Sequence, residues 1–146
     1  MENVKIDKIV VFAKMAVELS SLSKDPFTKV GAIILRPDFS ICSGGYNGLP
    51  KGYPDTPETW NNRELKNKIV KHAEENAISF SQDPTLKGYS IVVTHFPCPT
   101  CAGDMIQKGI SEVYYINDPR VDHNCELTMD LFNKIGIKYT QIKIIP

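Results

Sequence analysis

The sequence predicts an α/β protein with three layers (α/β/α), in which helices cover both faces of a central mixed sheet of five strands. Short apolar runs of strand length alternate with amphipathic segments of helix length along the 146 residues. An opening helix and a hairpin precede a helix–strand–helix–strand–helix–strand order, which mixes antiparallel with parallel pairing. Apolar residues make up 42% of the chain, enough for a sizeable core. The length suits a single domain over residues 1–146.

The first half of the chain predicts one helix, one hairpin and one long loop. Apolar residues at three- and four-residue spacing indicate the helix, which ends before Asp25-Pro26. Two mainly apolar runs on either side of Arg36-Pro37-Asp38 indicate the hairpin. A stretch rich in Gly, Pro, Asn and charge indicates the loop, and so long a loop in a compact protein is usually functional. In order, these elements are expected over 5–23, 30–35, 40–46 and 47–67.

The second half predicts alternating helices and strands. A β-branched run and two further apolar runs follow three helical segments in turn. Pro99 suits the first position of a helix, with Cys98 near its cap, and Gly136 suits a helix end. In order, these elements are expected over 71–82, 90–95, 99–108, 113–116, 126–134 and 137–145.

The charge balance and the lack of long apolar runs narrow the cellular context. Lys plus Arg equal Asp plus Glu at 17 each, which argues against a large basic surface for nucleic acid. No apolar run approaches the roughly 20 residues that span a bilayer, and residues 1–5 lack the pattern of a signal peptide. We therefore expect a cytoplasmic protein with neither nucleic acid nor a membrane as partner. Its four cysteines are then reduced thiols or metal ligands rather than disulfides.

Two short motifs carry the chemistry: His72-Ala73-Glu74, and Pro97-Cys98-Pro99-Thr100-Cys101. They supply one imidazole, two thiols and a carboxylate that need not be a ligand. A structural zinc site closes its shell with four protein ligands, whereas a catalytic site keeps one position for water. His-x-Glu followed by Pro-Cys-x-x-Cys is the motif pair of zinc-dependent deaminases, in which the Glu transfers protons.

The spacing inside each motif is compatible with a shared metal. Cys98 and Cys101 are one helical turn apart, and the positive end of a helix favours their thiolate forms. His72 and Glu74 are separated by about 200° around a helix, so they share a target only at a first turn. We expect two helix N-termini to converge on one zinc, with water as fourth ligand and Glu74 as proton carrier.

Two other interpretations of these residues stay open. Cys98 and Cys101 could form a redox-active pair, which would leave His72 and Glu74 without a role. Alternatively, the zinc could be purely structural. Its fourth ligand would then come from Cys42, His95, His123 or Cys125.

Further blocks of sequence extend the match beyond the metal motifs. They are Ser23-Lys24-Asp25-Pro26, Val30-Gly31-Ala32, the loop from Gly45 to Gly52, and the run from Val92 to Cys98. Together, over roughly residues 10–137, the chain resembles the cytidine and deoxycytidylate deaminase family. The pattern Gly-Tyr-Asn-Gly-x-Pro-x-Gly points to its deoxycytidylate branch.

The resemblance implies a cytidine deaminase-like fold and hydrolysis of dCMP to dUMP and ammonia, which feeds thymidylate synthesis. It implies one catalytic zinc per chain, held by His72, Cys98 and Cys101, with Glu74 as general acid and base. It also implies that Asn47 binds the deoxyribose hydroxyl, that the backbone around Ala73 reads the pyrimidine edge, and that Phe96 lines the base pocket.

The same resemblance implies regulation and assembly. Many members are homohexamers that dCTP activates and dTTP inhibits, each effector with Mg²⁺. The residues that match the effector site are Lys24, Gly48, Pro50 and Gly52. Glycines there allow a ligand to approach the backbone closely, although a plain glycine turn is the alternative.

The chain departs from the family pattern at two places. Glu75 stands where many members carry Leu, and we expect it to face solvent. Residues 118–122 replace a Tyr-His pair near the substrate, which leaves phosphate recognition open. Residues 53–71 contain neither Cys nor His, so we expect no second zinc. The candidate cations for a 5′-phosphate are Lys24, Lys29, Lys51, Arg63 and Arg120.

Other functions compete with a dCMP deaminase. A bifunctional dCMP/dCTP deaminase, or a deaminase of free cytidine, deoxycytidine or guanine, would use the same zinc chemistry. A tRNA adenosine deaminase conflicts with the zero net charge and with the glycine loop after residue 44. A non-enzymatic zinc-binding module would keep the metal but have no use for Glu74.

Overall fold

The computed structural model describes residues 2–117 and 123–144, and contains five strands and six helices in that part of the chain. The elements, in order, are α1 (Glu2–Ser20), β1 (Gly31–Leu35), β2 (Ile41–Tyr46), α2 (Pro57–Asn61), α3 (Arg63–Ile69), α4 (Ala73–Phe80), β3 (Ser90–Val93), α5 (Pro99–Lys108), β4 (Glu112–Tyr115), α6 (His123–Ile135) and β5 (Lys138–Gln141). The predicted helix over 99–108 has these same bounds, and the other predicted elements differ by a few residues at their ends.

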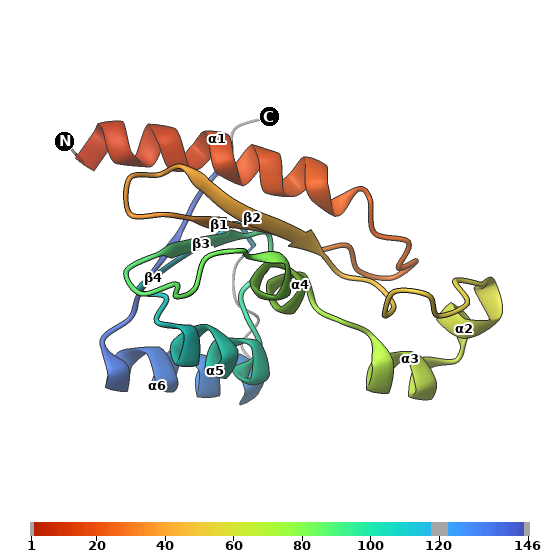
Figure 1. Cartoon of the computed structure of the whole chain (residues 1–146). Helices are drawn as coiled ribbons and strands as arrows, with labels where there is room; N and C mark the ends of the chain where they lie inside the picture. Colours follow the sequence, from red (N-terminus) through yellow and green to blue (C-terminus); the bar gives the residue numbers. More distant parts are fainter. Residues whose placement is uncertain (1, 118–122, 145–146) are drawn as a thin grey trace.

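The five strands form one mixed sheet in the order β2-β1-β3-β4-β5. β1 pairs antiparallel with β2 and with β3, whereas β3, β4 and β5 are parallel. Helix α1 covers one face of the sheet, and α4, α5 and α6 cover the other (Figure 1). The predicted three-layer α/β/α fold with a five-stranded mixed sheet is therefore confirmed.

Strand β1 shows how the sheet supplies both cores. Because successive side chains of a strand point to opposite faces, a strand between two helical layers is apolar throughout. Ala32 and Ile34 lie in the core beneath α4 and α5, and Ile33 and Leu35 lie in the core beneath α1. All four side chains are buried.

The strand directions place several loops at one edge of the sheet. β2 and β3 run the same way, because each is antiparallel to β1. Asn47 follows β2 directly, and the segment leading to Cys98 follows β3. The residue before β1, Val30, lies at this edge as well. Ligands bind beyond the carboxyl ends of the strands in open α/β sheets, so this edge is where we expect the site.

The prediction of a structureless loop over 47–67 is wrong, because two short helices lie there. Thr56 caps α2 through its side-chain oxygen, which accepts from the N–H of Thr59, and Pro57 occupies the first helical position. Asn62 caps α3 in the same way by accepting from the N–H of Leu65. Trp60 is buried and donates its ring N–H to Asp55 at 2.6 Å, so it anchors this segment.

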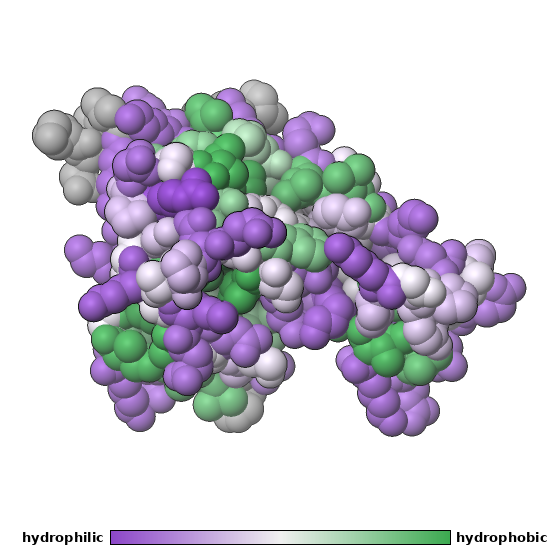
Figure 2. All heavy atoms as spheres, viewed as in Figure 1, coloured by the Kyte–Doolittle hydropathy of each residue, from purple (hydrophilic) through white to green (hydrophobic). Residues whose placement is uncertain are grey.

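Helices α2 and α3 form a lobe beside the main body, separated from α5 and α6 by a notch (Figures 1 and 2). The visible surface is mostly hydrophilic, with scattered apolar patches (Figure 2). Val11, Met15 and Val17 on α1 are among the exposed apolar residues. None of the helices in residues 2–117 and 123–144 combines the length and apolar character needed to cross a membrane.

Candidate functional site

The predicted metal ligands meet at two helix N-termini. His72 is the N-cap residue of α4, and Cys98 is the N-cap residue of α5. The Nδ1 atom of His72 lies 3.1 Å from the sulfur of Cys101 and 3.6 Å from that of Cys98. One potential ligand atom from each of the three residues lies within 4.8 Å of the others. The predicted convergence of two helix starts on one point is therefore present.

The sulfurs of the two cysteines differ in their electrostatic surroundings. Hydrogen bonds from the Cys101 thiol, the His72 ring and the Cys101 N–H lower the pKa of Cys98 to about 4, against the opposing effect of burial. The pKa of Cys101 is raised, because it donates to Cys98 and is buried. The pKa of His72 is raised as well, because Cys98 accepts a hydrogen bond from it. A bound dication would favour both thiolates and the neutral imidazole.

These donors fit a zinc ion with one position left for a non-protein ligand. One imidazole nitrogen and two thiolates are a ligand set of zinc-dependent deaminases. Among the side chains that the structure describes, no fourth His, Cys, Asp or Glu joins the group. Cys42 instead contacts the Ser81 hydroxyl at 3.2 Å, and the Nδ1 of His95 lies 2.8 Å from the Thr94 hydroxyl. The geometry thus favours a catalytic zinc over a closed structural site, and the closeness of His72 to both sulfurs favours a metal over a redox pair.

Glu74 is the buried carboxylate of the site. It is the second residue of α4 and is only 5% exposed. Burial raises the pKa of Glu74 to about 7, although the nearby His72 charge opposes this effect. A general acid and base works best when its pKa lies near the operating pH. The surroundings of Glu74 therefore suit the predicted role in proton transfer.

The prediction that Glu75 faces solvent is wrong, because both of its carboxylate oxygens have protein partners. One of its carboxylate oxygens accepts from the backbone N–H of His72 at 3.0 Å, and the other pairs with the Lys71 ammonium at 3.1 Å. A Glu at the third position of a helix that bonds back to the N-cap residue stabilises the helix start. Glu75 therefore holds the backbone of the predicted metal ligand His72 in place, and only 21% of its side chain is exposed.

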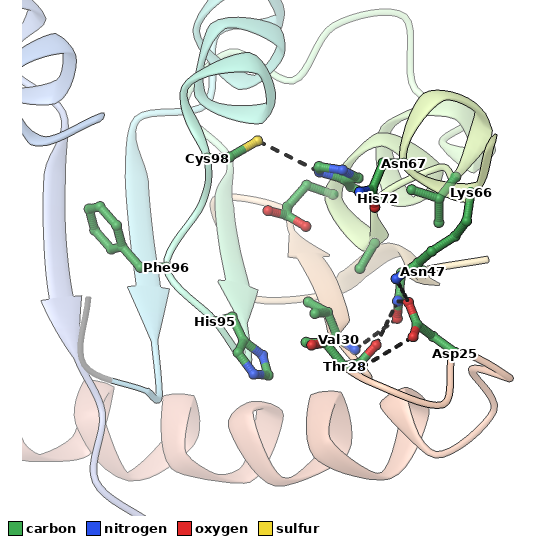
Figure 3. A pocket seen from close by; sticks show the side chains of 13 residues that line it. Asp25, Thr28, Val30, Asn47, Lys66, Asn67, His72, His95, Phe96 and Cys98 are labelled. Carbon is green, nitrogen blue, oxygen red and sulfur yellow. Dashed lines mark hydrogen bonds and ion pairs between the residues drawn. The ribbon is translucent and has the colours of Figure 1, made fainter. Parts of the chain in front are cut away.

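A cavity of about 260 Å³ opens beside the metal ligands (Figure 3). It is lined by Asp25, Thr28, Val30, Asn47, Lys66, Asn67, Val70, His72, Ala73, Glu74, His95, Phe96 and Cys98. We call His72, Glu74, Cys98 and Cys101 the metal end, and Asp25, Asn47 and Lys66 the network end. The three network-end side chains cluster together in Figure 3, apart from Cys98.

Asn47 lies in this cavity, as its predicted role requires, and is buried. Its Oδ1 atom accepts from the N–H of Val30 at 2.8 Å. Its Nδ2 atom donates to the carbonyl of Thr28 at 2.9 Å and to Asp25 at 3.3 Å. One donor and two acceptors around the amide fix which atom is oxygen and which is nitrogen.

Lys66 is the functional candidate that the sequence did not reveal. It lines the cavity and pairs with Asp25 at 3.0 Å, with side chains 11% and 3% exposed. Lys66 lies on α3 and Val70 directly follows this helix, so their spacing of four residues places them on one side of it. The helix caps at Thr56 and Asn62 are the sequence signal that could have indicated this helical segment.

Those predicted phosphate-binding cations that the structure describes do not line the cavity. Lys29 donates to the carbonyl of Ser23 at 2.6 Å. Lys51 and Arg63 lie over the rings of Phe80 and Phe27. Lys24 pairs with Asp55 at 3.6 Å. Arg120 belongs to residues 118–122, which lie outside the described residues.

Ala73 and Phe96 both border the cavity. Ala73 is the first residue of α4, so its backbone N–H has no carbonyl partner within that helix. The ring of Phe96 extends away from the labelled network-end residues in Figure 3. It lies edge-on to Tyr115, with centroids 4.9 Å apart, and packs near Phe132 and Tyr139. Phe96 therefore has a packing role in addition to any contact with a base.

The four residues matched to the effector site lie outside this cavity's lining. Lys24 borders a separate hollow beside Trp60. Gly48 exchanges two backbone hydrogen bonds with Lys71, at 3.0 and 2.7 Å, which ties the loop to the residue before His72. Pro50 accepts from the N–H of Tyr53, and Gly52 has a φ of 85° in that turn, a conformation that favours glycine.

Comparison with known proteins agrees with this geometry. Residues 6–117 match the family model of the cytidine and deoxycytidylate deaminase zinc-binding region. An uncharacterized deaminase from the luxG 3′ region of Aliivibrio fischeri is 41% identical over 138 residues, covering 91% of this chain and 92% of the relative. Human deoxycytidylate deaminase is 38% identical over 142 residues, covering 92% of this chain and 78% of the relative.

A solved structure resembles the chain over most of its length. The crystal structure of dCMP deaminase from the cyanophage S-TIM5, in complex with dCMP and dUMP, superposes with a TM-score of 0.73 at 29% identity. The superposition covers 90% of this chain and 93% of the phage chain. With its His/Cys/Cys metal group, buried Glu74 and matching sheet, the chain therefore belongs to the family of zinc-dependent cytidine and deoxycytidylate deaminases.

Proposed function

We propose that the chain hydrolyses dCMP to dUMP and ammonia and so supplies thymidylate synthesis. The observation that carries this proposal is the single cavity that joins the metal end to Asn47. The metal end provides hydrolytic chemistry, and Asn47 provides an acceptor for a sugar hydroxyl at the other end. A cytosine nucleotide offers the two matching groups, an amino group on a ring and a hydroxyl on a sugar.

The metal end performs the hydrolysis. When bound by His72, Cys98 and Cys101, zinc supplies a nucleophile by lowering the pKa of water to about 7. The carboxylate of Glu74 accepts a proton from the attacking water, delivers it to ring nitrogen N3, and then assists departure of the 4-amino group as ammonia. A pKa raised to about 7 suits a carboxyl group that must both accept and donate a proton.

The relatives support the nucleotide rather than the nucleoside. Human deoxycytidylate deaminase bears the name of this activity, and the phage structure holds dCMP and dUMP. The 5′-phosphate is proposed on the basis of these relatives. The cavity lining does not itself indicate a phosphate site, because Lys66, the lysine among the described lining residues, is already paired with Asp25.

A panel of substrates tests the proposal. Deoxycytidine, dCMP, dCTP, CMP and a short single-stranded DNA should be supplied at equal concentration and followed by chromatography, with the E74Q variant as the control for contaminating activity. We expect dCMP to react fastest, with kcat/KM at least about tenfold above deoxycytidine, the value of one charge-assisted hydrogen bond. Equal rates for dCMP and deoxycytidine would overturn the nucleotide assignment, and equal rates for dCMP and dCTP would point to the bifunctional deaminase.

Regulation and assembly stay predictions. Activation by dCTP, inhibition by dTTP, a role for Mg²⁺ and a homohexamer follow from the family resemblance alone. Repeating the panel with each nucleotide, and measuring the mass of the protein in solution, tests them separately from the reaction itself.

A further inference from the structure

We infer that Lys66 is a positioning residue for substrate selection: through Asp25 it holds the Asn47 amide so that this amide accepts a hydrogen bond from the sugar hydroxyl and donates none. The inference rests on the proposed function only in taking a cytosine nucleoside or nucleotide as the substrate. It assigns to Lys66 an indirect role, with Asn47 as the group that touches the sugar.

The hydrogen bonds of Asn47 leave it one free site. A side-chain amide has two N–H donors and two acceptor lone pairs on its oxygen. Both donors are engaged, by the carbonyl of Thr28 at 2.9 Å and by Asp25 at 3.3 Å. The Oδ1 atom uses one lone pair for the N–H of Val30 at 2.8 Å. The remaining lone pair can accept from a hydroxyl group and cannot bind another acceptor such as a phosphate oxygen.

Asp25 is the acceptor that orients the donor side of Asn47. One of its carboxylate oxygens accepts from the N–H of Phe27 at 2.8 Å and of Thr28 at 3.3 Å. The other oxygen faces the Asn47 amide and the Lys66 ammonium. Burial alone would raise the pKa of Asp25, but these donors hold it below the ordinary value. The carboxylate therefore stays ionised, an acceptor only, and the Asn47 amide has one stable orientation.

Lys66 supplies the charge that keeps this carboxylate buried and ionised. Its ammonium lies 3.0 Å from Asp25, 5.3 Å from the ring centre of Phe27 and 6.0 Å from that of Trp60. A buried carboxylate without a cation carries a large desolvation penalty. Removing the charge would therefore favour protonation or rearrangement of Asp25, and a protonated Asp25 would present a donor to the donor side of Asn47.

A single hydroxyl reports on this arrangement. In dCMP the free hydroxyl is at the 3′ position, and 2′,3′-dideoxy-CMP lacks it. A site that buries an acceptor discriminates against a ligand that cannot satisfy it. The inference predicts that Lys66 acts on this discrimination and has little further effect once the hydroxyl is gone.

The test compares kcat/KM for dCMP and 2′,3′-dideoxy-CMP, and for deoxycytidine and 2′,3′-dideoxycytidine, in four proteins. These are the wild type, K66M, K66R and K68M. Methionine keeps an unbranched stem without the charge, and arginine keeps the charge. Lys68 lies on the same helix, is 72% exposed and pairs with Glu64, so K68M is the matched control.

We expect the wild type to prefer the hydroxyl-bearing member of each pair by about tenfold, the value of one buried hydrogen bond. K66M should lower this preference to about twofold or less, while K66R and K68M keep it. Because the nucleoside pair reports on the hydroxyl without a phosphate, the test holds even if the enzyme prefers nucleosides. Failure of the nucleotide assignment is therefore distinguishable from failure of this inference.

Two results would overturn the inference. An equal loss on both members of each pair would show that Lys66 only stabilises the fold. A loss confined to the phosphorylated substrates would show that Lys66 contacts the phosphate directly. If K66M does not fold, K66Q replaces it, because glutamine still donates to Asp25 without a charge and should lower the hydroxyl preference by a smaller factor. An unchanged preference in K66Q would then count against the inference.

Discussion

At the metal end, two sulfurs and one imidazole nitrogen lie within 4.8 Å of one another and share hydrogen bonds that a metal ion would replace. At the network end, Asn47 already has three protein partners, and the buried carboxylate of Asp25 already has a cation. One end therefore has its ligand atoms ready for an ion, and the other has its polar groups already paired, apart from one lone pair of the Asn47 oxygen.

This difference teaches which property each end must keep. The metal end depends on the chemical identity of its atoms, since no other residue in the described part of the chain joins this group of metal-ligating side chains. The network end depends on orientation, since its groups act by presenting one lone pair in a fixed direction. Substitutions at the metal end should remove activity, and those at the network end should change stability and selectivity.

The largest expected effect is that of E74Q. Glutamine keeps the shape of the side chain but cannot carry a proton, so kcat should fall by at least about 100-fold. Zinc should stay at about one ion per chain by elemental analysis, because Glu74 is no metal ligand in this arrangement. Retained turnover would contradict the proposed proton transfer, and loss of zinc would show that Glu74 holds the metal.

The second prediction concerns D25N and pH. Asparagine would face the donors of Asn47 and Lys66 with an N–H group, so the free energy of unfolding should fall by about 3 kcal/mol at pH 7. The pKa of Asp25 is lowered in the folded protein. Its contribution is therefore full above the ordinary carboxyl pKa of about 4 and is lost as pH falls through the lowered value.

Urea unfolding of the wild type and D25N between about pH 7 and about pH 2.5 measures this. The stability gap between them should shrink as the pH falls below about 4. The control is D130N, since Asp130 is 55% exposed and pairs with Lys134 on the surface. A gap that does not change with pH would mean that the Asp25 charge contributes nothing.

The smallest expected effect is that of E75A. Loss of the helix-capping carboxylate should lower the free energy of unfolding by about 1 kcal/mol. It should also weaken zinc binding by about tenfold, because the backbone of His72 is less well held. Thermal unfolding and competition with a chelator measure the two effects, with the exposed Glu64 as E64A control. Unchanged zinc affinity would limit Glu75 to helix stability.

The sequence predicted the metal end better than the network end, for physical reasons. His72, Glu74, Cys98 and Cys101 lie in short motifs whose spacing implies helix starts. Helix α5 has its predicted bounds because Pro99 begins it and Gly109, with φ of 97°, ends it. These are local signals, and local signals are readable from one sequence.

Lys66 and Asp25 meet through the fold, 41 positions apart in the chain. That contact depends on α3, which the abundance of polar residues over 47–67 concealed. The role of Glu75 as a helix cap is not apparent from its residue type, because it depends on the backbone of His72, three residues earlier. Capping patterns indicate helix α3 and the role of Glu75, but they do not identify Asp25 as the partner of Lys66.

The pair of backbone hydrogen bonds between Gly48 and Lys71 closes the neck of the segment that contains α2 and α3. Residues inserted or deleted beyond that neck extend or shorten the lobe, while His72 stays at its distance from Asn47. The segment can therefore vary in length during evolution without moving the hydrolytic centre. In this chain, changes in the segment of α2 and α3 can therefore alter the substrate range without altering the hydrolytic chemistry.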